Sequence, residues 1–295
     1  MGTDRRCGAA LPLLATLVSV ALAACTSSTP RDAPGTASVV SAPVRVAHTT
    51  AGTVGYRIVG SGPPLVLIMG YAWSMEDWDP RLVHVLAGHH RVVMFDNTGV
   101  GQTTQLTPPV SIDDMAQQTS ALITTLGLGR VDVLGWSLGG TVAQALAVLH
   151  PAQVGRLVLC ATFPGNGQDT APPPSAQPDR SDFPANQARA QASFKAAIAE
   201  YPAPSPSASP ATAGQAEALS DWNVGQDPAG RKTGRIAART LIADGTEDAL
   251  DPLPNDRTLH RLIRGSQLKL YPGAGHAFLF QDWPSFGAEV SRFLA

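Results

Sequence analysis

Short, nearly all-apolar runs that recur along the chain constrain its fold more than any other feature of the sequence. Runs of this kind are typical of strands that are covered on both faces. Helical candidates lie between them: residues 111–126 begin with Ser111 and Asp114 at the spacing of a capping box, and residues 283–294 close the chain. The alternation predicts an α/β fold with a mostly parallel, twisted sheet and helices on both faces. The apolar runs are residues 65–69, 91–95, 131–134 and 156–160, and two further strands are expected over 240–243 and 267–271.

Two segments depart from this alternation. Residues 44–49 and 53–59 are typical of a β-hairpin. The stretch of about 163–234 interrupts the alternation and holds many of the chain's 25 prolines, which cannot lie inside a sheet. We expect this stretch to be a cap inserted over the carboxyl edge of the sheet, with helices near 185–201 and 213–222.

The N-terminus has the parts of a secretory signal peptide over residues 1–24. Basic residues precede an apolar run that is too short to span a bilayer permanently and that ends in small residues. The end of this run resembles the bacterial lipobox, in which a cysteine receives a lipid and becomes the first residue of the mature protein; here that cysteine is Cys25. We therefore expect export, a lipid anchor at Cys25 in the outward face of the cell membrane, a flexible tether over 25–43 and one domain over 44–295. Cleavage as an ordinary signal peptide, which would give a secreted protein, is the alternative.

Charge and cysteine content exclude several other classes of protein. The formal net charge is -2 and charged residues make up 15% of the chain, so no basic field is present to bind nucleic acid. Of the three cysteines, Cys7 leaves with the leader and Cys25 is the expected anchor, so no disulfide can form in the mature domain. Cys160 lies inside an apolar run and is expected to be a core residue. No histidine pairs with a cysteine at ligand spacing, so neither a metal nor a cofactor is expected.

The segment 135–139 carries the most specific catalytic pattern. Its sequence, Gly-Trp-Ser-Leu-Gly, follows a predicted strand and precedes the helical run 140–150. A sharp turn in this context strains Ser137 and exposes its hydroxyl at a helix N-terminus, and Gly135 and Gly139 remove side chains that would collide there. Ser137 is therefore the expected nucleophile.

A serine hydroxyl needs a base beside it, and His276 is the best candidate because its loop directly follows the strand 267–271. The third member must orient the imidazole and offset its charge. Asp248 is favoured, because it lies just past the strand 240–243 and can reach the same edge of the sheet. Asp244, Glu247 and Asp251 are close enough in the chain to compete for this assignment.

The chain order serine, aspartate, histidine, each after a successive strand, resembles the α/β-hydrolase superfamily over about residues 44–295. Residues 69–71 match the His-Gly-x loop of that superfamily with Met69 in place of histidine. Residues 96–103 resemble its Asp-x-Arg-Gly-x-Gly-x-Ser turn with Thr98 in place of arginine.

The resemblance also implies how the site is completed. It places the backbone amides of Tyr71 and Leu138 in the oxyanion hole, and it gives Asp96 the role of bracing its turn. It implies a serine hydrolase that forms an acyl-enzyme, with an ester of small or medium size as the expected substrate. Cofactor-free peroxidase or perhydrolase chemistry and C–C bond hydrolysis use the same three residues and remain alternatives. A non-catalytic binding lipoprotein is a further alternative. Relatives that hydrolyse epoxides or haloalkanes place aspartate where Ser137 stands, which disfavours those reactions.

Overall fold

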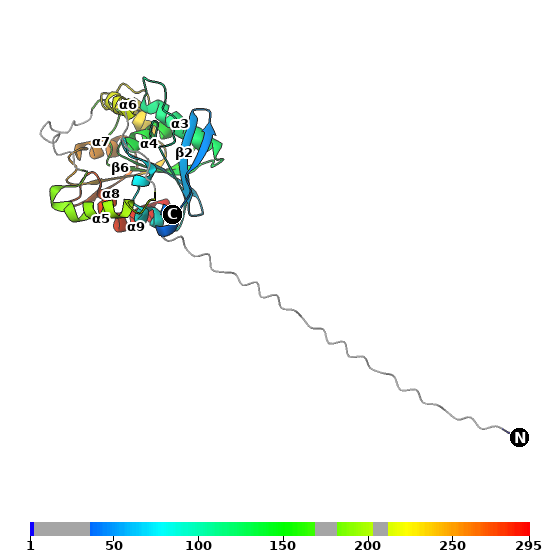
Figure 1. The fold of residues 1–295 in the computed structure, drawn as a ribbon. Coiled ribbons are helices and arrows are strands. Elements are labelled where there is room, and N and C mark those ends of the chain that lie inside the picture. The colour runs from blue at the N-terminus through cyan, green and yellow to red at the C-terminus, as the bar shows by residue number, and fades with distance from the viewer. Residues whose placement is uncertain (3–35, 169–181, 203–211) are drawn as a thin grey trace. The chain divides into compact units, whose positions relative to one another are not determined.

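A single sheet organises the part of the chain that the computed structural model describes, namely residues 1–2, 36–168, 182–202 and 212–295. Its eight strands follow the order β1-β2-β4-β3-β5-β6-β7-β8 (Figure 1). β1 pairs with β2, and β2 with β4, in antiparallel fashion, and the five other pairs are parallel. The predicted α/β fold with a mostly parallel sheet is confirmed. The strands are β1 Arg45–Thr49, β2 Gly52–Val59, β3 Pro64–Ile68, β4 Arg91–Phe95, β5 Val131–Trp136, β6 Val154–Cys160, β7 Arg239–Gly245 and β8 Gln267–Tyr271.

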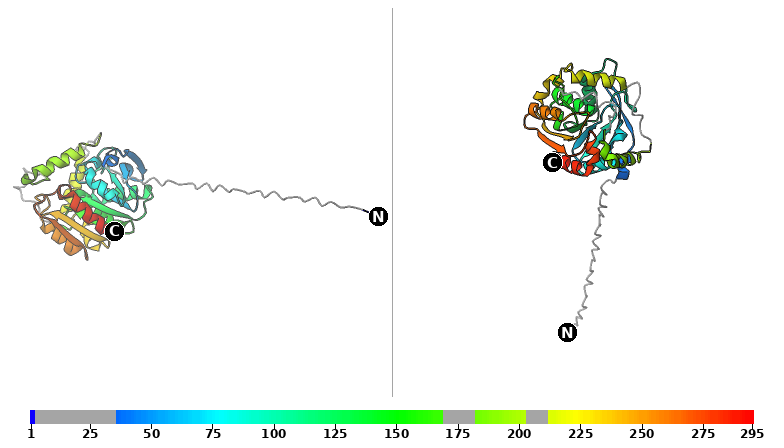
Figure 2. Two further views of the ribbon diagram at one scale, coloured as in Figure 1. Left: turned by 90° about the horizontal axis from the view of Figure 1, so that it is seen from below. Right: turned by 90° about the vertical axis from the view of Figure 1, so that its left-hand side faces the viewer.

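Helices cover both faces of this sheet, and the side chains of each strand alternate between two cores. In β3, Leu65 and Leu67 belong to the core that packs on α2 and α9, whereas Val66 and Ile68 belong to the core that packs on α3 and α4. Figure 2 shows the two layers from the side. The helices are α1 Thr36–Val40, α2 Pro80–Ala87, α3 Ile112–Thr125, α4 Leu138–Leu149, α5 Ala188–Ile198, α6 Ala213–Asn223, α7 Pro254–Leu262, α8 Phe278–Gln281 and α9 Trp283–Leu294, with 3-10 turns η1 Met75–Asp77, η3 Ala185–Gln187 and η5 Gly230–Arg235.

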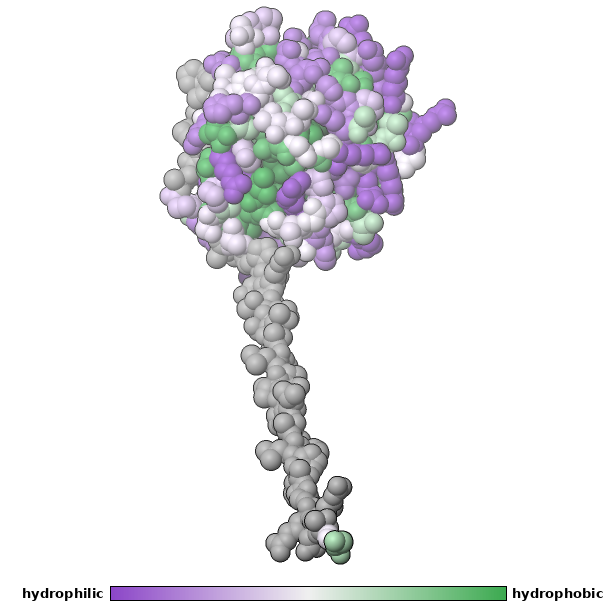
Figure 3. Space-filling view, turned by 90° about the vertical axis from the view of Figure 1, so that its right-hand side faces the viewer, coloured by the Kyte–Doolittle hydropathy of each residue, from purple (hydrophilic) through white to green (hydrophobic). Residues whose placement is uncertain are grey.

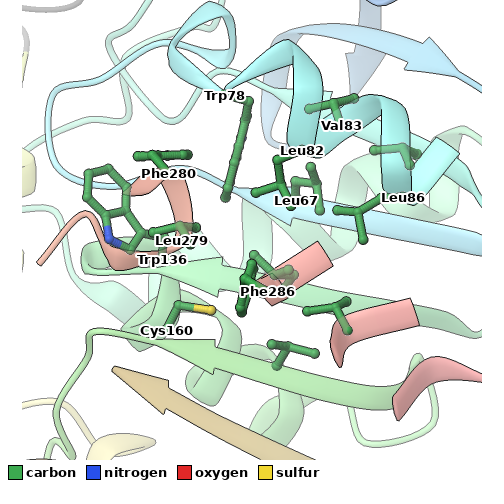
Figure 4. Close-up of a cluster of buried hydrophobic side chains, with 14 of the residues drawn as sticks. Leu67, Trp78, Leu82, Val83, Leu86, Trp136, Cys160, Leu279, Phe280 and Phe286 are labelled. Atoms are coloured by element: carbon green, nitrogen blue, oxygen red, sulfur yellow. The ribbon is translucent and has the colours of Figure 1, made fainter. Parts of the chain in front are cut away.

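Large side chains fill the core under α2 without exposure to solvent. Leu82 and Leu86 of α2 point toward Leu67 of the sheet, and Trp78 lies beside Phe280 (Figure 4). Their burial removes apolar surface from water, and each Å² of apolar surface buried contributes about 25 cal/mol to the free energy of folding. Cys160 is fully buried in this core, as its apolar context predicted. Burial raises the pKa of its thiol, which keeps the group protonated.

Local sequence signals place the helix ends close to where they were expected. Ser111 caps α3, because its hydroxyl accepts from the amide of Asp114 while the Asp114 carboxylate accepts from the amide of Ser111. The helix expected over 140–150 begins earlier, at Leu138, because the turn at Ser137 leads into it without an intervening loop. Both helices predicted inside the stretch 163–234 are present as α5 and α6.

The end of the expected tether is folded onto the domain. Residues 36–40 form helix α1, which packs against α2, and Val39 is fully buried. The pattern of small and polar residues around Val39 gave no sign of this contact, because a single buried valine is not a periodic signal. Residues 3–24 of the expected signal peptide, Cys25 and residues 26–35 of the expected tether lie outside the described residues.

A buried ion pair ties this segment to the rest of the domain. The guanidinium of Arg57 on β2 donates through Nε to Oε1 of Glu76 at 3.0 Å, and both side chains are almost fully shielded from water. Nη1 of Arg57 donates to the carbonyl of Ala42, and the guanidinium carbon lies 5.6 Å from the ring centroid of Tyr201. One cation therefore joins a strand, the segment before β1, the turn η1 and the chain after α5.

Loss of Arg57 is expected to destabilise the domain strongly. Arg57→Met would leave the Glu76 carboxylate buried without its counter-charge, and breaking such a pair costs about 3–5 kcal/mol. Urea unfolding followed by circular dichroism measures the change. Arg292→Met is the matched control. Nη1 of Arg292 lies 2.6 Å from Oε2 of Glu289 in an ion pair at the surface, and an exposed pair contributes roughly 0.2–1 kcal/mol. Equal losses in the two variants would contradict this account of the buried pair.

The surface of the described chain carries few large exposed apolar side chains. Figure 3 shows the face of the molecule that lies to the right in Figure 1, on the side of β2. Hydrophobic residues gather near the middle of this face, and hydrophilic residues surround them. Apart from Met1, the large hydrophobic residues exposed in the described ranges are Val46, Tyr71 and Val224. Among the described residues, no helix combines the length and hydrophobicity that crossing a bilayer requires.

Candidate active site

The turn between β5 and α4 holds Ser137 in an unusual backbone conformation. Its φ is 57° and its ψ is -124°, a region that non-glycine residues rarely adopt. A side chain at Gly135 would come 2.2 Å from the carbonyl of Gly139, and one at Gly139 would come 2.0 Å from the carbonyl of Ile68. Only glycine therefore allows the turn to close this tightly. The result places the hydroxyl of Ser137 at the carboxyl edge of the sheet and at the N-terminus of α4.

Three side chains that follow separate strands, and that the sequence predicted as a catalytic set, meet at this edge. Nε2 of His276 lies 2.8 Å from Oγ of Ser137, and Nδ1 of His276 lies 2.7 Å from Oδ2 of Asp248. The imidazole and the carboxylate are buried, whereas Ser137 is partly exposed. The indole of Trp136 donates to the carbonyl of His276 at 2.9 Å, which fixes the histidine loop against the turn.

The structure separates Asp248 from its neighbours in the chain. Oδ1 of Asp248 accepts from the amides of Leu250 and Asp251, so the loop itself holds the carboxylate toward His276. Asp244 instead accepts from the amide of the residue that follows it, at 2.6 Å, and Asp251 accepts from the side chain of Asn255. Of the competing aspartates, Asp248 is the one that contacts the imidazole.

The surroundings of His276 favour its protonated form. Burial of the ring opposes protonation, but the charge of Asp248 and the hydrogen bond to it outweigh burial, so that the pKa of His276 is raised above its ordinary value of 6.5. Asp182 and Asp256 add smaller contributions in the same direction. An imidazole of this kind stabilises the cation that forms when it takes the proton of a serine hydroxyl.

The loop after β3 lies directly against Ser137. A side chain at Gly70 would come 2.9 Å from the ring of Trp136 and 3.4 Å from Cβ of Ser137. The carbonyl of Gly70 accepts from the amide of Trp73 at 3.5 Å, so the N–H of Tyr71, on the same peptide plane, points the opposite way. The structure thus brings the loop that carries Tyr71 close to the start of α4, where Leu138 follows the serine.

Two residues of the turn after β4 brace this loop. Oδ1 of Asp96 accepts from the amide of Met75 at 2.8 Å, and the side-chain amide of Asn97 donates to the carbonyl of Met69 at 2.8 Å. Burial, opposed by the hydrogen bond from Met75, raises the pKa of Asp96 to about 7. Thr98 stands where the resemblance expects arginine, and its hydroxyl accepts from the amide of Leu106, which closes the turn without an arginine.

The inserted stretch contacts both sides of the site. α5 packs on α8 (Figure 1). The side chain of Phe194 on α5 stacks on Phe280 with ring centroids 4.6 Å apart and on Trp73 at 5.9 Å. α6 packs on α3 and α4, and its Gln215 accepts from the amide of Ala72. The sequence pointed to neither Trp73 nor Gln215. A single aromatic or glutamine in a loop or a small helix carries no periodic signal, so only the folded chain reveals these contacts.

A cluster of carboxylates lies behind Asp248. Asp244, Asp251 and Asp256 are buried, and each places one oxygen within 4.8 Å of the others. Burial, together with the charges of its acidic neighbours, raises the pKa of Asp244 well above its ordinary value, and burial raises that of Asp256 to about 7. Like charges this close disfavour one another's ionisation, so each neighbouring carboxylate helps to keep the others protonated. Asn255 contributes a side-chain donor to Asp251.

Comparison with known proteins places this architecture in a family. A sequence profile of the alpha/beta hydrolase fold matches residues 63–282, which is most of the chain. The chain belongs to the alpha/beta hydrolase fold family. The expectation drawn from its motifs is thereby confirmed, and the protein is an enzyme of the α/β-hydrolase superfamily, whose relatives include esterases, carbamate hydrolases, haloperoxidases and C–C bond hydrolases.

Individual α/β-hydrolases resemble the chain at moderate identity. The pimeloyl-[acyl-carrier protein] methyl ester esterase of Pseudoalteromonas atlantica is 36% identical over 118 residues, a match that spans 40% of this chain and 43% of the esterase. A putative carbamate hydrolase, RutD, of a Caulobacter species is 27% identical over 266 residues, 81% of this chain and 95% of that protein. The alpha/beta hydrolase fold protein from Chitinophaga pinensis superposes with a TM-score of 0.76 at 22% identity, over 86% of this chain and 98% of that one.

Proposed function

We propose that the protein is a carboxylic ester hydrolase in which Ser137, His276 and Asp248 act as nucleophile, general base and orienting carboxylate. The observation that carries the proposal is the continuous chain of contacts from Oγ of Ser137 through the imidazole of His276 to Oδ2 of Asp248, at 2.8 and 2.7 Å. These distances lie within hydrogen-bond reach of a nucleophile–base pair and of a base–orienter pair. The esterase among the relatives supports an ester as the substrate class.

The first half of the reaction forms an acyl-enzyme. With its Nδ1 proton directed at Asp248, His276 presents Nε2 to take the proton of Ser137 as the oxygen attacks the ester carbonyl. The oxyanion that forms lies between the start of α4 and the loop after β3, where the amides of Leu138 and Tyr71 would donate to it. His276 then returns the proton to the departing alcohol. Water, activated by the same imidazole, releases the acid and restores Ser137.

A fluorophosphonate probe tests this proposal directly, because it phosphonylates serines that a neighbouring base activates. We expect one labelled peptide, with the adduct on Ser137, and no labelling of His276→Ala. An unlabelled protein, or labelling that persists in His276→Ala, would overturn the assignment. An unlabelled protein would favour the non-catalytic binding protein instead.

Substrates of small or medium size suit the contacts of the inserted stretch. Its large apolar side chains Phe183, Phe194 and Trp222 are buried against the domain and do not form an exposed platform. Val224 is the large apolar side chain of the described part of that stretch that is exposed. Lipases, by contrast, present a broad apolar surface to lipid.

Hydrolysis is therefore expected to fall as the acyl chain lengthens beyond about eight carbons. Each further methylene contributes about 0.8 kcal/mol of binding free energy only if an apolar pocket buries it. Initial rates on p-nitrophenyl esters of increasing chain length measure this. Ser137→Ala gives the background rate for each ester. A maximum at long chains, or a jump in rate above the micellar threshold of the substrate, would show that the cap makes a lipid-binding surface.

We further propose that the protein is exported and anchored to the cell membrane through a lipid on Cys25, with the domain facing outward. The basic and apolar leader and the lipobox-like end of residues 1–24 support this proposal. An acyl anchor gains about 0.8 kcal/mol per buried methylene, so a diacylglyceryl group holds a protein at a membrane without a spanning helix.

Cys25→Ser is expected to move the protein from the membrane fraction to the soluble fraction, because it removes the thiol that takes the lipid. Fractionation of cells that express each form, followed by immunoblotting, gives the distribution. Cys7→Ser is the matched control, since Cys7 lies in the leader and is lost on cleavage. Mass spectrometry that finds an unmodified Cys25 at the mature N-terminus would refute the anchor.

A further inference from the structure

A buried glutamine of the cap reaches the loop beside the serine. Gln215 lies in the first turn of α6 and has no exposure to solvent. Its Oε1 accepts from the amide of Ala72 at 2.9 Å, and its Nε2 donates to the carbonyl of Thr98 at 2.7 Å. The side chain therefore joins the cap to two separate loops at the carboxyl edge of the sheet, those after β3 and β4.

These contacts flank the peptide that carries the N–H of Tyr71. On one side, the side-chain amide of Asn97 holds the carbonyl of Met69 at 2.8 Å. On the other, Gln215 holds the amide of Ala72. Because both neighbouring peptide planes are fixed, the peptide between Gly70 and Tyr71 has little freedom to rotate, and its N–H keeps one direction.

The conformation of Ala72 needs such support. Its φ is 59°, in the left-handed region that costs a residue with a side chain about 1–2 kcal/mol. The buried hydrogen bond from its amide to Gln215 offsets that cost. Leaving this amide without an acceptor would favour a different loop conformation.

We propose that Gln215 is a positioning residue of the oxyanion hole, through which the seating of cap helix α6 controls the direction of the Tyr71 amide. The inference rests on the proposed ester hydrolase function. Glutamine suits this role because one side chain supplies both an acceptor for Ala72 and a donor for Thr98. Any movement of α6 away from the domain would break both bonds together. Under this proposal the hydrolase is fully active only when α6 is packed in its place.

The test compares Gln215→Met with Gln144→Met. Gln144 is an equally buried glutamine that donates to the carbonyl of Phe163 at 3.0 Å and accepts from the hydroxyl of Thr233, so these bonds do not involve the loop of Tyr71. Both variants lose buried hydrogen bonds and are expected to lower the melting temperature. Only Gln215→Met is expected to lower kcat, roughly 10- to 100-fold, which is less than the 10²–10³-fold loss that follows removal of an oxyanion donor outright.

Two further readouts separate positioning from a general loss of structure. KM is expected to stay within about twofold, because the contact acts mainly on the transition state. The affinity for a small alkylboronic acid, which forms a tetrahedral adduct with the serine, is expected to fall by the same factor as kcat. If Gln215→Met does not fold, Gln215→Asn, one methylene shorter, replaces it with a smaller expected loss.

The outcomes distinguish this inference from the proposed function. A wild-type protein that hydrolyses no ester and is not labelled at Ser137 would overturn the function. A wild-type esterase in which Gln215→Met, or the folded Gln215→Asn, keeps the kcat and boronate affinity of Gln144→Met would overturn the role of Gln215 alone.

Discussion

Replacement of Ser137 by alanine is expected to lower kcat on a short-chain ester by several orders of magnitude, up to about 10⁶-fold, as is the replacement of His276 by alanine. The two side chains act as one unit: without the serine no acyl-enzyme forms, and without the imidazole the hydroxyl keeps its proton. Stopped-flow or steady-state release of p-nitrophenol measures the loss. The double variant is expected to be no worse than either single variant, since each alone already disables the unit.

The fold should survive these substitutions. The side chain of Ser137 is small and only partly buried, and its Oγ hydrogen-bonds to Nε2 of His276 at 2.8 Å. A circular dichroism spectrum and a melting curve for each variant test whether the fold is kept. Activity retained by both folded variants would exclude the proposed mechanism.

Asp248→Asn is expected to lower kcat by roughly 10⁴-fold, because an amide can donate to Nδ1 of the imidazole and stabilise the wrong tautomer. The same change removes the charge that raises the pKa of His276, and burial then lowers that pKa. Only the neutral imidazole accepts the serine proton, so activity falls at acid pH. The acid limb of the residual kcat/KM profile should therefore move to lower pH than in the wild type.

Asp251→Asn is the matched control for this prediction. Asp251 is buried like Asp248 and lies three residues away, but its Oδ1 accepts from the side-chain amide of Asn255, whereas Oδ2 of Asp248 contacts the imidazole. We expect a mild effect on kcat and an acid limb close to that of the wild type. A severe loss in Asp251→Asn with a mild one in Asp248→Asn would transfer the orienting role to Asp251.

Much of the sheet could be predicted from the sequence because its strands are covered on both faces. A strand such as β3 contributes to two cores at once, so almost every residue in it must be apolar, and such a run stands out in the sequence. The turn at Ser137 was equally legible, since Gly135 and Gly139 have no tolerance for a side chain. Both signals arise from residues that are close together in the chain, so the sequence alone reveals them.

Contacts made by single residues across long separations in the chain could not be predicted in this way. Arg57 binds Glu76 and Ala42, and Gln215 binds Ala72 across 143 positions. Nothing in the neighbourhood of either residue depends on its partner, so no spacing or periodicity records the contact. The choice of Asp248 over its neighbours was open for a related reason, because the loop conformation that aims one carboxylate at His276 appears only when β7 and β8 lie side by side.

The backbone of Ser137 links the chemistry of this protein to the way such a chain can evolve. A serine held at a φ of 57° is in a strained backbone conformation that destabilises the folded state, whereas glycine adopts the same conformation with less strain. Selection for a more robust fold alone would thus favour glycine at 137, and selection for turnover would oppose it. A serine that persists here across a lineage is a record that catalysis, rather than folding, has been under selection.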